Sequence, residues 1–133
     1  MLAERIEVDG TLLAIYIPKN CRPTGLSFYS NPSDGLQFAT YWANRGYKIP
    51  SHIHFNRDTI IEKVNEVLYV ESGRVLVDLF GDSSSILAQK LMEKGDTIVL
   101  LEGGYGFTFL EESSLIYVKQ GPYVSKEDDK RLL

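Results

Sequence analysis

Cysteine is nearly absent from this chain, which argues against disulfides and against a catalytic thiol. Its 133 residues contain one cysteine, Cys21, so no disulfide can form within the chain. The flanking residues Asn20, Arg22 and Pro23 are typical of a turn and offer no base that would activate a thiol. The opening residues, MLAERIEVDG, lack an apolar run as long as a signal peptide needs. We therefore expect a cytoplasmic protein without disulfides or a catalytic cysteine.

Long apolar runs and an excess of positive charge are also missing. The longest apolar stretches, such as residues 98–101, have the length of a strand and are far too short to span a bilayer. There are 14 Lys and Arg against 18 Asp and Glu, which gives a formal net charge of −4. Because a nucleic-acid interface needs clustered basic residues, and here they are scattered singly, we expect neither nucleic acid nor membrane as a partner.

What the chain does have is a regular succession of short apolar runs separated by Gly, Pro, Asn and Asp over residues 5–123. This pattern indicates an all-β fold in one domain rather than alternating strands and helices. Asp9-Gly10 predicts a tight hairpin turn within residues 5–17. Many short antiparallel strands without a long crossover are typical of a sandwich, jelly roll or barrel. Further strands are expected at 35–42, 67–70, 74–80, 87–91, 97–101, 105–110 and 115–119.

Three segments have more specific expectations. Residues 18–31 are expected to be a turn-rich stretch. The strands at 67–70 and 74–80 flank a short Gly-containing loop and should pair antiparallel. Residues 124–133 are expected to be a solvated tail, in which Ser125 could cap a helix of barely two turns.

Both histidines of the chain lie in one tripeptide, as His52 and His54. In an extended strand, residues i and i+2 point to the same face, so both imidazoles could reach one ion. The alternative is that they are ordinary surface or core histidines.

Glu66 begins the strand at 67–70 and by alternation shares the face of Leu68 and Val70, which should be the core face. A buried carboxylate is costly without a partner, and a divalent cation is one such partner. Two histidines and a carboxylate form the facial triad of nonheme Fe(II), with positions left open for water or substrate. Zn, Mn, Ni or Co could use the same ligands. In the alternative interpretation Glu66 is exposed near the end of its strand.

Two motifs in the sequence resemble those of the cupin superfamily. Gly46, five residues, His52-X-His54 and then Glu66-Val-Leu-Tyr-Val-Glu-Ser-Gly73 resemble the first cupin motif, although the eleven residues between His54 and Glu66 make a longer insertion than is common. Residues 95–107 resemble the second motif, which begins Gly-Asp and ends near a fourth ligand, normally His. Here Tyr105 stands in place of that histidine. A phenol is a poor ligand until it is deprotonated, so Tyr105 is expected to hydrogen-bond a bound water or substrate oxygen.

Residues 103–107, 118–123 and 128–131 are similar to a subgroup of small bacterial cupins found among cell-surface polysaccharide genes. The resemblance covers residues 35–131. It implies one cupin domain over residues 1–133, a double-stranded β-helix or jelly-roll barrel with its core at about 35–123. It also implies a divalent metal (Fe, Zn, Mn or Ni) at His52, His54 and Glu66, and a homodimer.

Aromatic residues are the candidates for the wall of a substrate pocket. Tyr105 and Phe107 share a strand face with Phe109, and such a wall beside a metal suits a sugar ring or another small organic ligand. For Phe107 and Phe109 the favoured alternative is that they are plain core. Tyr47 is a further pocket candidate, although alternation does not define which way it faces.

Three functions remain open. The first is an isomerase or epimerase acting on a carbohydrate or nucleotide-sugar, with the metal as Lewis acid. Because no spare histidine exists, its base would be Glu62, Tyr105 or a metal-bound hydroxide. The second is an Fe(II) dioxygenase, and the third is a module that binds a small ligand without turnover. Ser-His-Asp, phosphate-loop and Cys-X-X-Cys arrangements are absent from the sequence, which argues against hydrolase, kinase and redox-thiol functions.

Overall fold

A computed structural model describes residues 2–123 and 125–133 of the chain. Contacts between residues divide the chain into two compact units. The first unit comprises Met1–Cys21 and Val64–Leu133, and the second comprises Arg22–Lys63. The described residues form ten strands and one four-residue helix, so the fold belongs to the all-β class. In this part of the chain no helix has the length and hydrophobicity needed to cross a bilayer.

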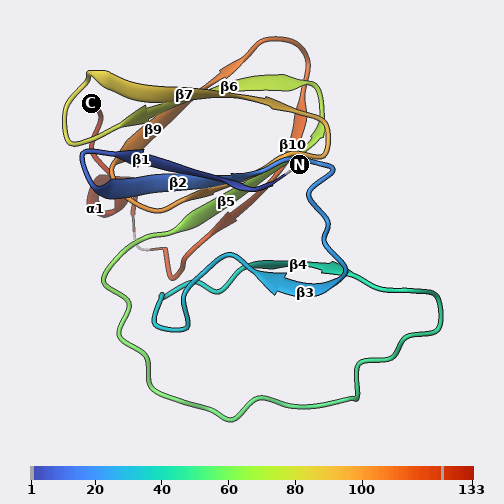
Figure 1. Cartoon of the computed structure of the whole chain (residues 1–133). Helices are drawn as coiled ribbons and strands as arrows, with labels where there is room; N and C mark the ends of the chain where they lie inside the picture. The colour runs from blue at the N-terminus through green and yellow to red at the C-terminus, as the bar shows by residue number, and fades with distance from the viewer. Residues whose placement is uncertain (1, 124) are drawn as a thin grey trace. The chain divides into compact units, whose positions relative to one another are not determined.

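The first unit consists of two antiparallel sheets that lie face to face (Figure 1). The five-stranded sheet has the order β1-β2-β8-β5-β10, and the three-stranded sheet has the order β7-β6-β9. Each strand supplies alternate side chains to the space between the sheets, as the burial of every second residue of β5 and β6 shows. The bounds are β1 (Glu4–Val8), β2 (Thr11–Ile17), β5 (Glu66–Ser72), β6 (Arg74–Phe80), β7 (Ile86–Glu93), β8 (Thr97–Leu100), β9 (Gly104–Phe109) and β10 (Ser114–Lys119).

The N-terminal hairpin is confirmed. β1 pairs antiparallel with β2, and Asp9 and Gly10 between them both have positive φ angles, of 51° and 79°. Two successive residues with positive φ form a turn whose twist matches that of the flanking strands, which is why Asp-Gly favours it.

The predicted pairing of residues 67–70 with 74–80 is wrong. β5 pairs with β8 and β10, whereas β6 pairs with β7 and β9 in the other sheet. Gly73, with a φ of 91°, lies between the two strands at the point where the chain passes from one sheet to the other. A Cβ atom at this position would collide with Ser113, so the crossing requires glycine.

The second unit contains a two-stranded sheet, in which β3 (Gly25–Phe28) pairs antiparallel with β4 (Ala39–Trp42). β3 lies within the turn-rich residues 18–31, where no strand is assigned from the sequence, and the strand expected at 35–42 begins only at Ala39. A stack of Tyr29 on Phe38, with ring centroids 6.4 Å apart, and a 2.9 Å hydrogen bond between the hydroxyls of Tyr29 and Thr40 continue the pairing beyond the strands. These contacts explain how a segment rich in turn residues is held extended.

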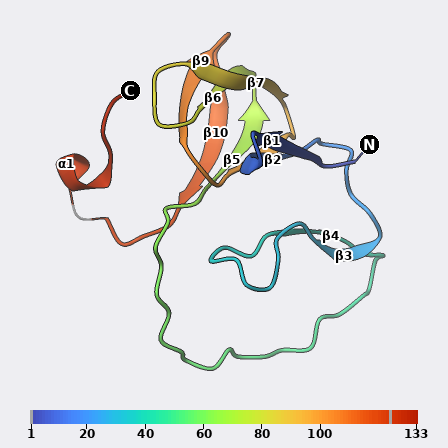
Figure 2. The same cartoon turned by 60° about the vertical axis from the view of Figure 1, so that its left-hand side comes forward.

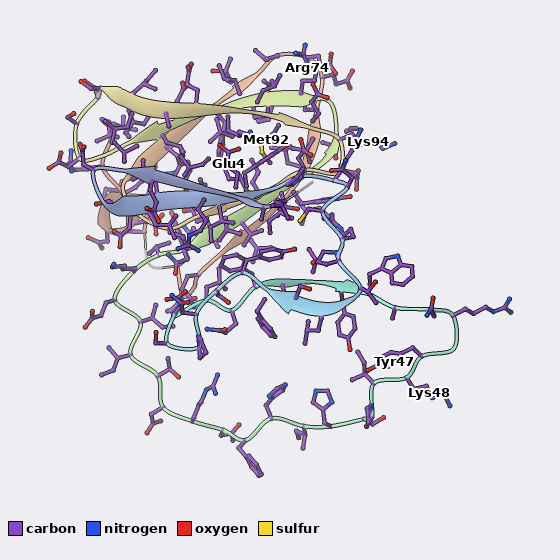
Figure 3. All side chains as sticks on the ribbon, viewed as in Figure 1. Glu4, Tyr47, Lys48, Arg74, Met92 and Lys94 are labelled. Atoms are coloured by element: carbon purple, nitrogen blue, oxygen red, sulfur yellow. The ribbon has the colours of Figure 1, made fainter. Side chains whose placement is uncertain are left out.

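The hydrophobic core of the first unit lies between its two sheets. Met92 of β7 is fully buried there, and Figure 3 shows its sulfur between the layers. The other core residues are aliphatic and come from both sheets, which is the pattern of a two-layer β-structure. They are Ile6, Leu13, Ala14, Leu68, Val70, Val75, Val77, Leu79, Ile98 and Leu100.

Asp96 is buried at the turn between β7 and β8, and its carboxylate organises that turn. Its Oδ2 accepts hydrogen bonds from the Tyr16 hydroxyl at 2.8 Å and from the Glu93 amide at 2.9 Å. Its Oδ1 accepts one from the Lys19 amide at 2.9 Å. The Gly-Asp pair that opens the second cupin-like motif thus has a structural role here.

Asp96→Ala should destabilise the protein by about 3 kcal/mol or more, because three donors lose their acceptor and each costs about 1–3 kcal/mol. Urea unfolding followed by circular dichroism measures the change. Asp58→Ala, which removes an exposed carboxylate of the second unit, is the control and should have little effect. A loss below about 1 kcal/mol for Asp96→Ala would show that solvent or a rearranged turn replaces the carboxylate.

Candidate functional site

The first unit contains a cavity of about 720 Å³. This volume lies in the range of pockets that bind small organic ligands. Its wall combines strands of both sheets with the loop after β6 and the C-terminal segment. The residues that line it include Glu66, Tyr105, Tyr117, Asp129, Lys130 and Arg131.

Glu66 faces inward, as alternation predicted. It shares the buried face of β5 with Leu68 and Val70, and only 7% of its surface is exposed. Its Oε2 is buried and has no hydrogen-bond partner among the described residues. Burial raises the pKa of this carboxyl, while a hydrogen bond from Tyr117 and the charge of Lys119 act in the opposite direction. A buried carboxylate oxygen without a partner is a position that a ligand or cation would satisfy.

Tyr117 is a site residue that sequence reasoning missed. In the pairing of β10 with β5, Tyr117 lies opposite Leu68 and Lys119 lies opposite Glu66. Directly opposed residues share a face of the sheet, so both side chains lie on the face of Glu66. Burial and the hydrogen bond to Glu66 raise the pKa of Tyr117 above that of an ordinary tyrosine, so this phenol remains a hydrogen-bond donor. Alternation of side chains within residues 115–119 is compatible with an inward-facing Tyr117. Only the register between β10 and β5 shows that Tyr117 shares the face of Glu66.

Tyr105 lies in the cavity wall near Tyr117, with the two hydroxyl oxygens 3.5 Å apart. Its ring stacks on Phe107 with centroids 5.1 Å apart. Phe107 and Tyr105 both pack against the hydrophobic core, whereas Phe109 at the end of β9 is 57% exposed. Tyr105 and Glu66 are therefore the two predicted site residues that the structure brings to one cavity, and Phe107 supports the ring of Tyr105.

The two histidines belong to the second unit, in a segment that forms no strand from residue 43 to residue 65. The nitrogen His52 Nδ1 donates a 2.8 Å hydrogen bond to the Pro50 carbonyl, which leaves the Nε2 lone pair available for a metal. The rings of His52 and His54 have centroids 5.2 Å apart. Two imidazoles that bind one ion have centroids up to about 6.5 Å apart, given metal–nitrogen bonds of about 2.1 Å. The separation of the two rings lies within this limit.

The complete metal triad stays a prediction, because His52 and His54 lie in the second unit and Glu66 in the first. Over residues 2–123 and 125–133, the structure groups no three His, Cys, Asp or Glu side chains as ligands of one ion. The donors nevertheless fit a divalent cation in kind, since Glu66 offers an unpartnered carboxylate oxygen and His52 a free imidazole nitrogen.

The remaining predicted site residues, Tyr47 and Glu62, also belong to the second unit and are exposed. Tyr47 contacts Tyr41, with ring centroids 6.4 Å apart, and Figure 3 shows it beside Lys48 on the long segment that follows β4. Their roles in a pocket and in catalysis stay predictions.

The C-terminal segment borders the cavity. Ser125 caps the helix α1 (Lys126–Asp129), as predicted, by accepting a hydrogen bond from the Asp128 amide. Beyond α1 the chain runs toward the loop between β6 and β7 (Figure 2), where Arg131 Nη2 donates to the Asp82 carbonyl at 3.0 Å. Lys119 Nζ and Asp129 Oδ2 form a 2.7 Å ion pair with about four-fifths of both side chains buried. Part of the expected solvated tail is thus bound to the first unit.

Comparisons with known proteins do not add to this description. No protein-family model matches the chain, and no significantly similar curated protein or solved structure was found. The all-β class therefore rests on the strands themselves, and the resemblance to cupins rests on the motifs in the sequence.

Proposed function

We propose that this chain is a metal-dependent cupin that binds a sugar or nucleotide-sugar in the cavity of the first unit and acts on it as an isomerase or epimerase. The observation that carries the proposal is the environment of Glu66. Glu66, whose Oε2 is buried and unpartnered among the described residues, lines a cavity of about 720 Å³ together with Tyr105 and Tyr117, whose hydroxyl oxygens lie 3.5 Å apart. Carboxylates, hydroxyls and an aromatic face are the groups that hold a hydroxyl-rich ring.

In this proposal His52, His54 and Glu66 hold a divalent ion: Fe, Zn, Mn or Ni. When bound, the ion supplies Lewis-acid polarisation of a carbonyl or enediolate oxygen of the sugar. Hydrogen bonding of His52 to the Pro50 carbonyl supports this role, because it fixes the ring and its tautomer in the way that metal-binding histidines require.

The tyrosines orient the ligand. Tyr105 presents a ring face and a hydroxyl to the cavity, and Tyr117 adds a second hydroxyl that remains protonated. Isomerisation also needs a group that moves a proton between neighbouring carbons, and Tyr105 and Glu62 are the candidates for it. Tyr105 is the better supported of the two, since it lies in the cavity wall.

Tyr105→Phe tests the proposal. It should weaken the binding of a nucleotide-sugar by roughly 5- to 20-fold, the effect of one lost hydrogen bond, and leave the metal content unchanged. Isothermal titration calorimetry with a panel of free sugars and nucleotide-sugars measures the first effect, and elemental analysis the second. Tyr69→Phe on the opposite face of β5 is the matched control. If no member of the panel binds the wild-type protein, the proposed ligand class is wrong.

A second candidate is a sugar-binding module without turnover. It is favoured by Tyr105, which stands where cupins normally have their fourth metal ligand. Incubating the metal-loaded protein with a sugar that binds, followed by NMR of the sugar, separates the two: an isomerase converts it and a binding module does not. Oxygen consumption by iron-loaded protein would instead support a dioxygenase.

A further inference from the structure

We propose that the part of the cavity wall formed by Lys130, Arg131 and Ser84 binds a phosphate group of the ligand. The inference rests on the proposed function, because it assigns part of the same cavity to the phosphate of a sugar phosphate or nucleotide-sugar. All three residues line the cavity.

Lys130 and Arg131 are two cations that line the cavity, and the charge of Lys130 opposes the rise in the pKa of Glu66 that burial causes. Among the described residues, neither side chain forms an ion pair. The nearest acidic residue in the chain, Asp129, has its own cation, because its Oδ2 lies 2.7 Å from Lys119 Nζ. Two adjacent cations therefore border the cavity, together with the paired carboxylate of Asp129 and the carboxylates of Glu66 and Asp82.

Arg131 contacts the protein through a hydrogen bond that leaves its charge unpaired by that contact. One of its nitrogens, Nη2, donates to the Asp82 backbone carbonyl at 3.0 Å, which is a neutral acceptor. A guanidinium has five N–H donors in a rigid fork, so most of them remain for an anion. Ser84, two residues after Asp82 in the same loop, adds a hydroxyl donor to the wall. A guanidinium, an ammonium and a hydroxyl are a donor set typical of phosphate recognition.

The segment that carries both cations is attached at each end. Before it, the ion pair of Asp129 with Lys119 joins α1 to β10. After it, Leu133 packs at Gly104 so closely that a Cβ atom at Gly104 would collide with the leucine side chain. The two cations are thus held at the cavity by contacts other than their own.

The experiment titrates the full-length protein with inorganic pyrophosphate at low ionic strength, followed by the NMR shifts of the tyrosine rings and by calorimetry. Wild-type protein should bind pyrophosphate, and the Kd should rise about tenfold or more in K130Q/R131Q, since charge-assisted hydrogen bonds to phosphate are lost. The control K94Q/K126Q removes the same charge from two exposed lysines that do not line the cavity. Figures 1 and 3 show Lys94 at the opposite end of the first unit from the C-terminus.

The outcomes separate the possibilities. A Kd that rises in K130Q/R131Q and hardly changes in K94Q/K126Q supports the subsite. Equal weakening in both variants would indicate attraction to the overall charge, and no binding to wild type would also overturn the subsite. If neutral sugars and metal bind normally while pyrophosphate does not, the subsite is wrong and the proposed function stands. If pyrophosphate alone binds, with the expected dependence on Arg131, the proposed function is wrong and the subsite stands.

Discussion

The double variant His52→Ala, His54→Ala should lose nearly all of its bound divalent metal, from about one equivalent per chain to less than about a tenth, because two of three ligands are removed. Elemental analysis of protein purified without a histidine tag measures the content. Two contacts within one short segment support this expectation. The ring centroids of His52 and His54 lie 5.2 Å apart, and His52 is oriented by its hydrogen bond to the Pro50 carbonyl.

Ile53→Ala is the matched control for this variant. Ile53 lies between the two histidines and is 90% exposed, so its truncation changes the same segment without removing a ligand. Metal content should remain that of the wild type. Equal loading of the wild type and the double-histidine variant would refute the metal site, whatever the fold of the chain.

Glu66→Gln should have two opposite effects. Metal affinity should fall by about tenfold or more, because an amide is a much poorer ligand than a carboxylate. The metal-free protein should become more stable at neutral pH, since the change removes a buried charge whose Oε2 has no partner. Thermal unfolding with and without metal measures both effects, and Glu71→Gln, on an exposed position of the same strand, is the control.

The pH dependence has a definite sign. The pKa of Glu66 is raised in the folded state, chiefly by burial, so the folded protein holds this proton more tightly than the unfolded chain does. The contribution of Glu66 to stability therefore falls as the pH rises from the ordinary carboxyl pKa through the raised value. Metal-free Glu66→Gln should lack this decline. Parallel stability–pH curves for the variant and the wild type would contradict it.

Much of the fold could be predicted because each strand carries its own signal. Alternation and glycine-containing turns located most strands of the first unit, and Asp9-Gly10 specified its hairpin. The pairing of β5 with β6 was wrongly predicted because a short loop with Gly73 suits a tight hairpin and a crossing between sheets equally well. β3 was missed because its four residues have too short a pattern, and its extended form depends on contacts with the segment around Phe38 and Thr40.

The candidate site was predictable to the extent that it depends on alternation. Glu66 faces inward because it precedes the buried residues Leu68 and Val70 by two and four positions in the same strand. Tyr117 could not be identified in this way, because its place beside Glu66 depends on the register between strands that are far apart in sequence. The cavity contacts of Asp129 and Arg131 were missed for a related reason, since their partners Lys119 and Asp82 lie elsewhere in the chain.

The strand order of the five-stranded sheet also has a consequence for synthesis on the ribosome. β2 lies between β1 and β8 in this sheet. It ends at Ile17, and β8 begins only at Thr97, so about 80 residues must be translated before the two strands can pair. At about 5–20 residues per second this takes roughly 4 to 16 s. An isolated two-stranded hairpin is barely stable in water. The nascent hairpin therefore emerges with an apolar face and an open edge, and this edge stays unpaired until β8 has been synthesised.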